Sequence, residues 1–330
     1  MNELSPLPDD LLQVRDLETH FPVLTGILGR ASGVVHAVDG VSFTLRRGET
    51  LGLVGESGSG KSTLGKSIMR LVNPTAGSIK INGQEITGLS KSQMKPFRRN
   101  VQMVFQDPYS SLNPRLRVGK IVAEALKVHG IADGKEARDI VAEIFRKVGL
   151  RASDMRKFPN EFSGGQRQRI GIARALVLNP SLIIADEAVS ALDVSVQAQV
   201  INLLMDLQKE FGLSYLFIAH DLSIVAQVCD RIAVMYLGQI VEIATRRDLF
   251  RDPRHPYTQS LLASIPVSHP GLRRAKTELL PGDIPSATRP PPGCRFNTRC
   301  PIATDRCRAE RPVLKDYGDG HWAACFNCTP

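Results

Sequence analysis

The sequence predicts an α/β fold with a partly parallel sheet, and three observations lead to this prediction. A short apolar run at 50–54 leads directly into a glycine-rich loop. Two more apolar runs, at 182–186 and 214–219, flank an amphipathic helical segment, which is the strand-helix-strand order of parallel pairing. Asn82-Gly83 between two short alternating segments is the strongest local signal for a β-hairpin. A mixed sheet with helices is therefore expected.

The other elements follow in order along the chain. Alternation of apolar and polar residues at 41–45 predicts a half-buried strand, and 78–86 predicts the hairpin. From about 115 to 160 the apolar residues take a helical spacing, which predicts a helical insert. The segment 235–243 has a glycine in its middle and is interpreted as a second hairpin.

Frequent prolines distinguish the C-terminal part from the rest of the sequence. They recur after residue 250, culminate in the run 290–292 and prevent long regular elements. We place a boundary near 245–265. The predicted domains are therefore 12–250, with a helical subdomain at about 107–165, and 251–330.

Composition and charge narrow the class of protein. Of 330 residues, 42% are hydrophobic and 23% are charged, which is typical of a globular chain and excludes a disordered or collagen-like one. The longest apolar stretches fall far short of the roughly 18 residues that a membrane-spanning helix needs. The N-terminus lacks the basic and apolar regions of a signal peptide, so we expect a cytosolic chain.

The net charge of +9 is unevenly distributed. Residues 1–245 carry 28 basic and 25 acidic side chains, whereas 246–315 carry 14 and 6. An evenly basic chain would suggest nucleic acid or an anionic membrane as a partner. Because the excess of positive charge lies in the C-terminal part, we interpret it together with the cysteines of that part.

The octapeptide from Gly55 to Ser62 fits the phosphate-binding pattern G-x-x-x-x-G-K-[ST] directly after a predicted strand. Its glycines let successive backbone N–H groups point at phosphate oxygens. Lys61 supplies a cation for the β- and γ-phosphates, and Ser62 can ligate Mg²⁺. The predicted nucleotide-binding residues are Gly55, Ser57, Gly58, Ser59, Gly60, Lys61, Ser62 and Thr63.

Two carboxylates, Asp186 and Glu187, end an apolar strand. Asp186 would hold Mg²⁺, and Glu187 would orient and polarise the attacking water. A strand that ends in Asp-Glu is as often a solvated turn, but behind a phosphate-binding loop the catalytic interpretation is favoured. A second glycine motif, Ser163 to Gln166, precedes a helical segment and is either an N-cap or a second anion-binding helix terminus.

Five of the six cysteines lie in the last 37 residues: Cys294, Cys300, Cys307, Cys325 and Cys328. Structural disulfides are disfavoured in the cytosol, so a metal is the leading interpretation. Only the last two have the short spacing of typical zinc ligands, and spacing alone leaves zinc and an iron–sulfur cluster equally open. Cys229 stands apart and is expected to be a packed thiol.

Taken together, the motifs resemble those of the ATP-binding-cassette (ABC) transporter ATPases over about residues 12–245. The resemblance rests on order and spacing of Gly55–Ser62, Phe105–Pro108, Phe162–Gln166, Ile183–Glu187, Ser190–Asp193 and Ala219–Asp221. It implies a P-loop ATPase domain with a mixed sheet core, an antiparallel β subdomain and a helical subdomain. Ala188 stands where the family usually has proline, which leaves the carboxylates intact.

The resemblance also implies roles for single residues. Gln106 would join Mg²⁺ and the attacking water, and His220 would contact the γ-phosphate. Asp193 would link the two sites of a dimer. Phe21 is the candidate for stacking on adenine. The residues that would hold ATP bound to the opposing subunit are Ser163, Gly164, Gly165 and Gln166.

The C-terminal part resembles the extension of ATPases that serve dipeptide, oligopeptide and nickel importers. The segment 255–262 and the spacing of Cys294, Cys300 and Cys307 carry this resemblance. It implies a [4Fe–4S] cluster, with Zn²⁺ as the alternative. Cys325 is the implied fourth ligand, because the family pattern ends in Ala-Cys, and Cys328 is spare. We expect Arg295, Arg299, Arg306 and Arg308 either to offset the negative charge of the cluster or to be solvated.

The implied protein is an ATP-hydrolysing subunit of an importer, peripheral on the cytoplasmic face of the inner membrane. Its partners would be a homologous second ATPase subunit, two membrane permease subunits and an extracytoplasmic solute-binding protein, but no nucleic acid. Dipeptides or oligopeptides are the expected cargo, with nickel, glutathione or another small solute as alternatives. A soluble cassette ATPase acting on nucleic acid or ribosomes is the rival, and it predicts tandem cassettes or a coiled-coil insertion, which the sequence lacks.

Overall fold

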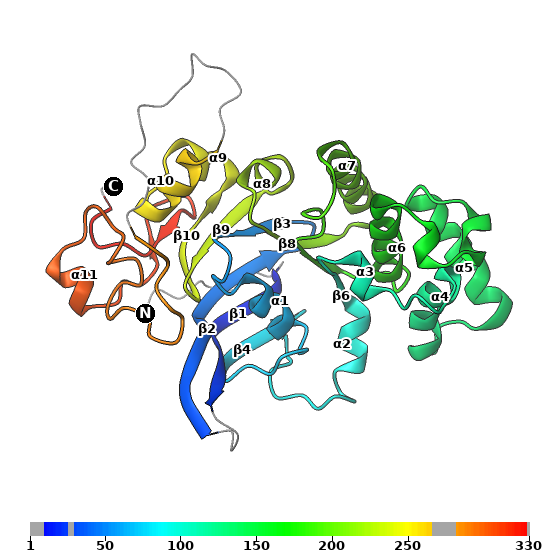
Figure 1. Cartoon of the computed structure of the whole chain (residues 1–330), viewed down its shortest axis with the longest axis horizontal. Helices are drawn as coiled ribbons and strands as arrows, with labels where there is room; N and C mark the ends of the chain where they lie inside the picture. The colour runs from blue at the N-terminus through cyan, green and yellow to red at the C-terminus, as the bar shows by residue number, and fades with distance from the viewer. Residues whose placement is uncertain (1–9, 26–29, 266–281, 329–330) are drawn as a thin grey trace, which may run out of the picture. The chain divides into compact units, whose positions relative to one another are not determined.

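A computed structural model of the chain describes residues 10–25, 30–265 and 282–328 (Figure 1). The chain forms two compact units. Unit 1 contains residues 1–44, 51–87 and 219–330, and unit 2 contains residues 45–50 and 88–218. The C-terminal segment 251–330 thus belongs to the same unit as the glycine-rich loop.

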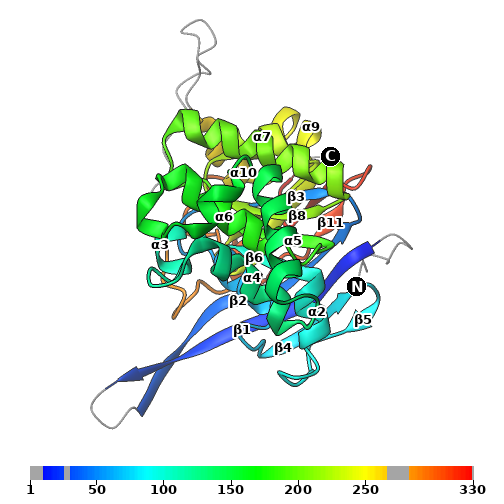
Figure 2. The same ribbon diagram turned by 90° about the vertical axis from the view of Figure 1, so that its right-hand side faces the viewer.

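An antiparallel sheet with strand order β2-β1-β4-β5 forms one part of unit 1. Its strands are β1 (Asp10–Thr25), β2 (Arg30–Arg46), β4 (Ala76–Ile81) and β5 (Gln84–Glu85). The long strands β1 and β2 extend together as a two-stranded arm (Figure 2). Asn82 and Gly83 have φ angles of 52° and 76°, as a tight hairpin turn requires, which confirms the hairpin expected there.

The second sheet region of unit 1 has the order β11-β12-β10-β9-β3. Its strands are β3 (Thr50–Val54), β9 (Arg231–Tyr236), β10 (Gln239–Thr245), β11 (Lys315–Asp316) and β12 (Trp322–Ala323). β3 runs parallel to β9, and β9 and β10 form the second predicted hairpin through Leu237 and Gly238, both with positive φ. The C-terminal strands therefore extend the edge of this sheet at β10.

Five short helices complete unit 1 within its described residues: α1 (Lys61–Ile68), α8 (Leu222–Val228), α9 (Arg246–Arg251), α10 (Pro256–Ala263) and α11 (Asp305–Ala309). Pro256 occupies the first turn of α10, where its missing N–H costs nothing, and the His255 ring accepts the Tyr257 N–H at 3.1 Å. As the prolines predict, irregular chain fills 282–304 between these helices.

Unit 2 is built on parallel strands in the order β8-β7-β6. They are β6 (Val101–Val104), β7 (Leu182–Asp186) and β8 (Ser214–Ala219), and the helix between the last two is α7 (Val194–Phe211). Strands β7 and β8 pair in parallel with Leu182 opposite Ser214, which confirms the predicted strand-helix-strand unit. Gly212 ends α7 in the left-handed conformation that glycine adopts without steric cost.

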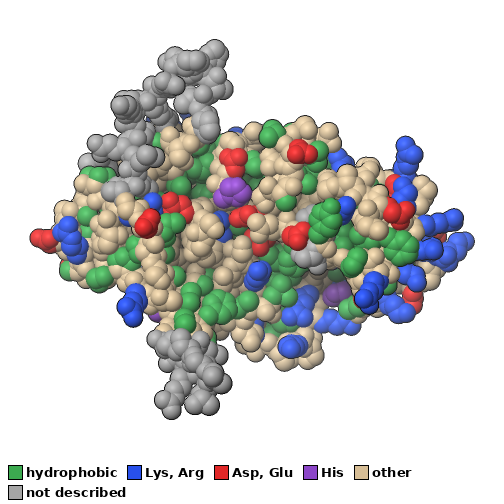
Figure 3. All heavy atoms as spheres, in the orientation of Figure 1, with side chains coloured by type: hydrophobic (Ala, Val, Ile, Leu, Met, Phe, Trp, Pro, Cys, Tyr) green, Lys and Arg blue, Asp and Glu red, His purple; other side chains and the backbone are tan. Residues whose placement is uncertain are grey.

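The remaining helices of unit 2 are α2 (Lys95–Asn100), α3 (Pro108–Ser111), α4 (Val118–Val128), α5 (Gly134–Lys147), the 3₁₀ turns η1 (Ala152–Arg156) and η2 (Pro159–Glu161), and α6 (Gly164–Leu176). The apolar face of α5 buries Ala137, Val141 and Phe145, as the periodicity predicts. Lys and Arg side chains gather over α4 and α5 (Figure 3), so the near-balance of charge in 1–245 conceals a local basic surface. None of the helices in the described segments is long and apolar enough to cross a bilayer.

Candidate functional site

The glycine-rich loop of unit 1 connects β3 to α1. Lys61 is the first residue of α1, and its side chain curls back into the loop. Its Nζ donates to the carbonyl oxygens of Gly55 at 2.7 Å and Glu56 at 2.9 Å, and to the Ser59 hydroxyl at 3.3 Å. Only 4% of the residue is exposed. A charged amine held at the first turn of a helix, where backbone N–H groups are also unpaired within the helix, forms a binding site for phosphate oxygens.

Two glycines shape this loop for a steric reason. A Cβ on Gly55 would lie 2.1 Å from the Met235 carbonyl oxygen, and a Cβ on Gly60 would lie 1.9 Å from that of Ala37. Their φ angles of 154° and 104° are also ones that other residues rarely adopt. The loop therefore packs directly against the backbone of β9 and of the strand β2, which only glycine permits.

In unit 2, the structure brings Gln106 and Glu187 together. Gln106 follows β6 and Glu187 follows β7, two neighbouring parallel strands, so both lie at the carboxyl edge of the sheet. The Gln106 Nε2 donates to Glu187 Oε2 at 2.7 Å. Asp186, the last residue of β7, is 4% exposed. The carboxylates of Asp186 and Glu187 and the side-chain amide of Gln106 thus lie at one edge of the sheet. Their oxygen atoms are ligands of the kind that Mg²⁺ prefers.

The backbone of Glu187 is fixed in an uncommon conformation. Its φ is +46°, which is rare for a residue with a side chain. Its N–H donates to the Ile218 carbonyl at 2.9 Å, and its own carbonyl accepts the Ser190 N–H at 3.1 Å. Strain of this kind persists only where neighbours hold it, and it directs the carboxylate toward Gln106.

The second glycine motif begins α6. Ser163 is the N-cap: its hydroxyl accepts the Gln166 N–H at 3.3 Å, while the Gln166 side chain accepts the Ser163 N–H at 3.0 Å. This reciprocal pair is a capping box. The N-cap alternative is therefore present in the structure, and it leaves the backbone N–H groups of Gly164 and Gly165 at the start of a 13-residue helix.

Three other candidate residues lie at the ends of strands or helices or on a strand. Asp193 is the N-cap residue of α7, although its side chain makes no capping hydrogen bond. His220 is exposed directly after β8. Phe21 lies on β1 with 37% of its surface exposed. Cys229 is buried, and burial raises the pKa of its thiol, as expected for a packed cysteine.

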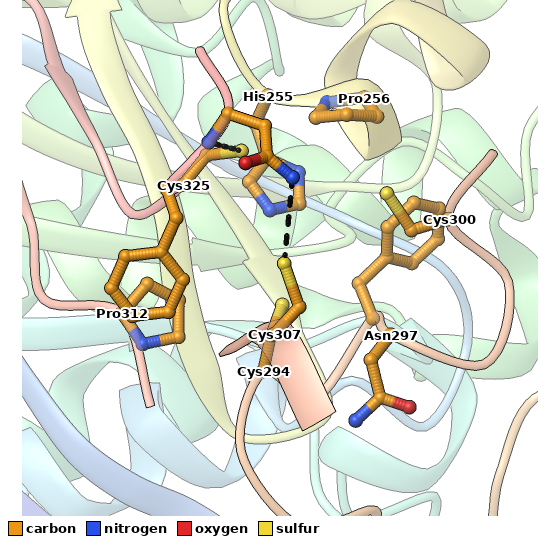
Figure 4. Close-up of a pocket in the computed structure, with 11 residues that line it drawn as sticks. His255, Pro256, Cys294, Asn297, Cys300, Cys307, Pro312 and Cys325 are labelled. Carbon is orange, nitrogen blue, oxygen red and sulfur yellow. Dashed lines mark hydrogen bonds between the residues drawn. The ribbon is translucent and has the colours of Figure 1, made fainter. Parts of the chain in front are cut away.

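Four of the C-terminal cysteines line one pocket in unit 1 (Figure 4). The side chains of Cys294, Cys300, Cys307 and Cys325 surround this space together with His255 and Phe296. The Asn327 backbone N–H donates to the sulfur of Cys325 at 3.4 Å, and its side-chain amide donates to the sulfur of Cys307 at 3.5 Å. The Cys328 thiol contacts the Arg254 carbonyl at 3.2 Å and also hydrogen-bonds to the thiol of Cys325. The four cysteines expected to be ligands thus line the pocket, and Cys328 lies next to Cys325 without lining it.

The donor set of this pocket fits both of the metal groups that the spacing left open. Four cysteine thiolates can hold a zinc ion or an iron–sulfur cluster, and the structure places four cysteine side chains around one space.

The four arginines near the cysteines were expected either to offset the charge of a cluster or to be solvated, and the structure shows the solvated alternative for Arg306 and Arg308 and neither alternative for Arg295 and Arg299. Arg295 pairs with Asp39 at 2.6 Å and Arg299 with Glu56 at 2.8 Å, both carboxylates far away in sequence. Arg306 and Arg308 pair with Glu310 and Asp305 beside them on the surface. Each guanidinium thus has a carboxylate partner, and the first two connect the cysteine segment to the rest of unit 1.

Asp39 is the centre of a buried polar group that the sequence did not indicate. Burial alone would raise its pKa, but hydrogen bonds from Gln239 and Arg295 and the charges of Arg295 and Arg311 outweigh burial and lower the pKa to about 2. The rings of His20 and His36 approach its other oxygen, so that the two ring nitrogens and this oxygen lie within 4.8 Å of one another. The two arginines already supply the positive charge that a metal cation would bring, so this group is structural.

The chain matches two sequence families. Residues 38–190 match the family described as ABC transporter, and residues 241–307 match the oligopeptide/dipeptide transporter C-terminal region. It is 51% identical to an oligopeptide transport ATP-binding protein of Bacillus subtilis, over 96% of this chain and 97% of the relative. It is 52% identical to a probable peptide ABC transporter ATP-binding protein of Sinorhizobium fredii, over 98% and 92%.

Solved structures show the same fold. A dimeric ATP-binding cassette in a post-hydrolysis state with ADP and Pi is 28% identical, with a TM-score of 0.64, and the match covers 72% of this chain and 99% of that one. A cassette from Clostridium perfringens that is part of an ABC transporter complex is 28% identical, with a TM-score of 0.63, covering 74% and 92%. The predicted α/β cassette fold is thereby confirmed.

Proposed function

The chain belongs to the ATP-binding subunits of ABC transporters, and from this premise we propose that it hydrolyses ATP to drive peptide uptake through separate permease subunits. The single observation that carries the cargo assignment is the C-terminal match at 241–307 to the region found in oligopeptide and dipeptide transporters. Relatives that are about 50% identical over nearly the whole chain are named as peptide or oligopeptide transport ATP-binding proteins.

We assign the chemistry to the residues that the motifs identify. The loop from Gly55 to Thr63, with Lys61 at its centre, binds the phosphates of ATP. Mg²⁺ held by Ser62, Gln106 and Asp186 would neutralise part of the phosphate charge. Glu187, held by Gln106, orients the attacking water, and His220 contacts the γ-phosphate. Most of the rate enhancement then comes from positioning and charge stabilisation rather than from covalent chemistry.

The assembly follows from the same premise. We propose that the chain pairs with a homologous ATPase subunit, so that Ser163 to Gln166 hold ATP bound to the partner and Asp193 links the two sites. Phe21 stacks on adenine. The pair acts on the cytoplasmic face of the membrane beneath two permease subunits, and an extracytoplasmic binding protein delivers the peptide.

We further propose that the cysteine pocket holds a [4Fe–4S] cluster on Cys294, Cys300, Cys307 and Cys325. Support comes from the four cysteine side chains around one space, which are the donor set of such a cluster. Such a cluster, when bound, supplies either a structural crosslink among the four segments or a one-electron redox centre.

The functional proposal is tested with the protein in its assembly. Proteoliposomes that contain the permease, both ATPase subunits and the binding protein should hydrolyse ATP faster when a peptide mixture is added. Labelled peptide should accumulate inside only when ATP is on the side of the ATPase subunits. Stimulation by nickel or glutathione, with none by peptides, would contradict the cargo assignment and leave the ATPase assignment intact.

The cysteine assignment predicts different outcomes for two neighbouring cysteines. Cys325→Ser should remove the visible iron–sulfur absorbance and lower iron from about four atoms per chain to well below one, because one of four ligands is lost. Cys328→Ser is the comparison variant and should retain both, because Cys328 does not line the pocket, although its thiol hydrogen-bonds to that of Cys325. Anaerobic purification with metal analysis measures this. One zinc and no iron in the unmodified chain would contradict the cluster.

A further inference from the structure

We propose that Arg299 and Tyr257 are positioning residues for the phosphate-binding loop, so that nucleotide affinity is linked to the order of the cysteine segment beside them. This inference rests on the proposed ATP-binding function. It assigns to the C-terminal extension a direct part in holding the loop that contains Lys61.

All three polar groups of Glu56, the residue after the first glycine of the loop, are engaged. Its carboxylate receives both terminal nitrogens of Arg299, at 2.8 and 3.2 Å. Its N–H donates to the Tyr257 hydroxyl at 2.8 Å, and its carbonyl accepts from Lys61 Nζ at 2.9 Å. Two of the three contacts therefore come from the C-terminal extension, and the third is the lysine that would bind phosphate.

These contacts are partly buried, which gives them more energetic weight than contacts on the open surface. The Arg299 side chain is 8% exposed and that of Glu56 26%, and Tyr257 is fully buried. A two-bond arginine–carboxylate pair fixes orientation as well as distance. Removal of one member of a buried pair leaves the other charge without a partner, which costs far more than loss of a surface pair. The backbone at Glu56 is consequently held from outside the loop.

The same arginine is part of the cysteine segment. Arg299 immediately precedes Cys300, and its N–H donates to the Phe296 carbonyl at 3.0 Å, within the turns that connect Cys294 to Cys300. The Phe296 ring packs edge-on against the Tyr236 ring, with 5.2 Å between the ring centroids. Its centroid lies 5.5 Å from that of the Tyr257 ring. A shift of this segment therefore moves both the guanidinium and the aromatic support of the tyrosine that contact Glu56.

A second attachment holds the segment from its other end. Arg295, which follows Cys294, donates to Asp39 Oδ2 at 2.6 Å, and Arg311 donates to the Asp39 carbonyl and carboxylate. The segment is thus fixed to β2 on one side and to the phosphate-binding loop on the other. Anything that orders the cysteines orders Arg299, and by thermodynamic reciprocity a nucleotide that orders the loop also orders the cysteines.

The test measures both directions of this linkage on the full chain. A non-hydrolysable ATP analogue is titrated to obtain its Kd, and alkylation of Cys294 and Cys300 by iodoacetamide is followed by mass spectrometry with and without the analogue. In the unmodified chain, saturating analogue should slow alkylation about tenfold, within the usual range of coupling between sites. Alkylation is measured on chain freed of metal by a chelator, because a thiolate bound to a metal does not react with iodoacetamide.

Variants distinguish the proposed route from general damage. Arg299→Gln should weaken analogue binding about tenfold and reduce the protection of the cysteines to below about twofold. Arg299→Lys, which retains the charge but not the two-bond geometry, should restore part of both. Arg308→Gln is the matched control: it also lies next to a cysteine, but its partner is Asp305 on the surface, so both readouts should remain unchanged.

Glu56→Gln breaks the same pair from the loop side and provides an independent variant should Arg299→Gln fold poorly. It should reproduce the loss of protection. Equal protection of the cysteines in the unmodified chain and in both variants would overturn the inference. An unmodified chain that binds no analogue would instead contradict the proposed ATP-binding function, so the two failures are distinguishable.

Discussion

Glu187→Gln is expected to lower the maximal ATP hydrolysis rate of the assembled ATPase by about 100- to 1,000-fold, the usual contribution of a positioned general base. ATP affinity should stay within about twofold, because the amide retains the size of the carboxylate. The structure explains why so small a change should matter. The Glu187 carboxylate accepts from Gln106 at 2.7 Å, and the backbone at φ +46° is held by the Ile218 carbonyl.

Steady-state phosphate release at saturating ATP measures this effect, together with equilibrium binding of ATP to the variant. Glu143→Gln is a suitable control, because it removes a carboxylate from the exposed surface of α5 without touching the edge of the sheet. Hydrolysis at an unchanged rate in Glu187→Gln would show that another group orients the water, and the assignment of Glu187 would then be wrong.

Lys61→Ala is expected to weaken ATP binding by about 100-fold or more. Hydrogen bonds that involve a charged group contribute about 1.5–3 kcal/mol each, and the ammonium would serve two phosphates. Removal also exposes the carbonyl oxygens of Gly55 and Glu56, which the lysine covers at 2.7 and 2.9 Å and which would repel phosphate. The loss therefore combines a missing cation with an unfavourable dipole.

Equilibrium titration with a fluorescent ATP analogue gives the affinity of Lys61→Ala, and thermal unfolding shows whether the variant remains folded. Lys66→Ala, in the last turn of the same helix α1, removes an equal charge away from the loop and should bind the analogue normally. An affinity within about fivefold of the unmodified chain in Lys61→Ala would exclude this loop as the main phosphate site.

The elements that could be predicted from the sequence are those whose signal is local. The strand before Gly55, the hairpin at Asn82-Gly83 and the strand-helix-strand unit at 182–219 each depend on neighbouring residues and on a period of two or 3.6. The resemblance implied separate roles for Gln106 and Glu187, and the structure adds the hydrogen bond between them. Their roles in ATP hydrolysis stay predictions until the variants are measured.

The partners of the arginines could not be predicted in the same way. Spacing suggested that Arg295 and Arg299 serve the nearby cysteines, yet their carboxylates, Asp39 and Glu56, are 256 and 243 residues away in the chain. Nothing in the local pattern marks Glu56, which occupies a position in the loop motif that accepts any residue. The contact forms in the folded chain, where the C-terminal extension also adds β12 to the edge of β10.

The sequence by itself thus determined the α/β fold class, the phosphate-binding loop and the cysteines to be considered, because each is written in residue type and short-range spacing. Only the tertiary structure decided that four of these cysteines share one pocket and which residues hold Glu56. The physical reason is that a buried charged side chain needs a partner of opposite charge. Which distant residue becomes that partner is decided only when the chain folds.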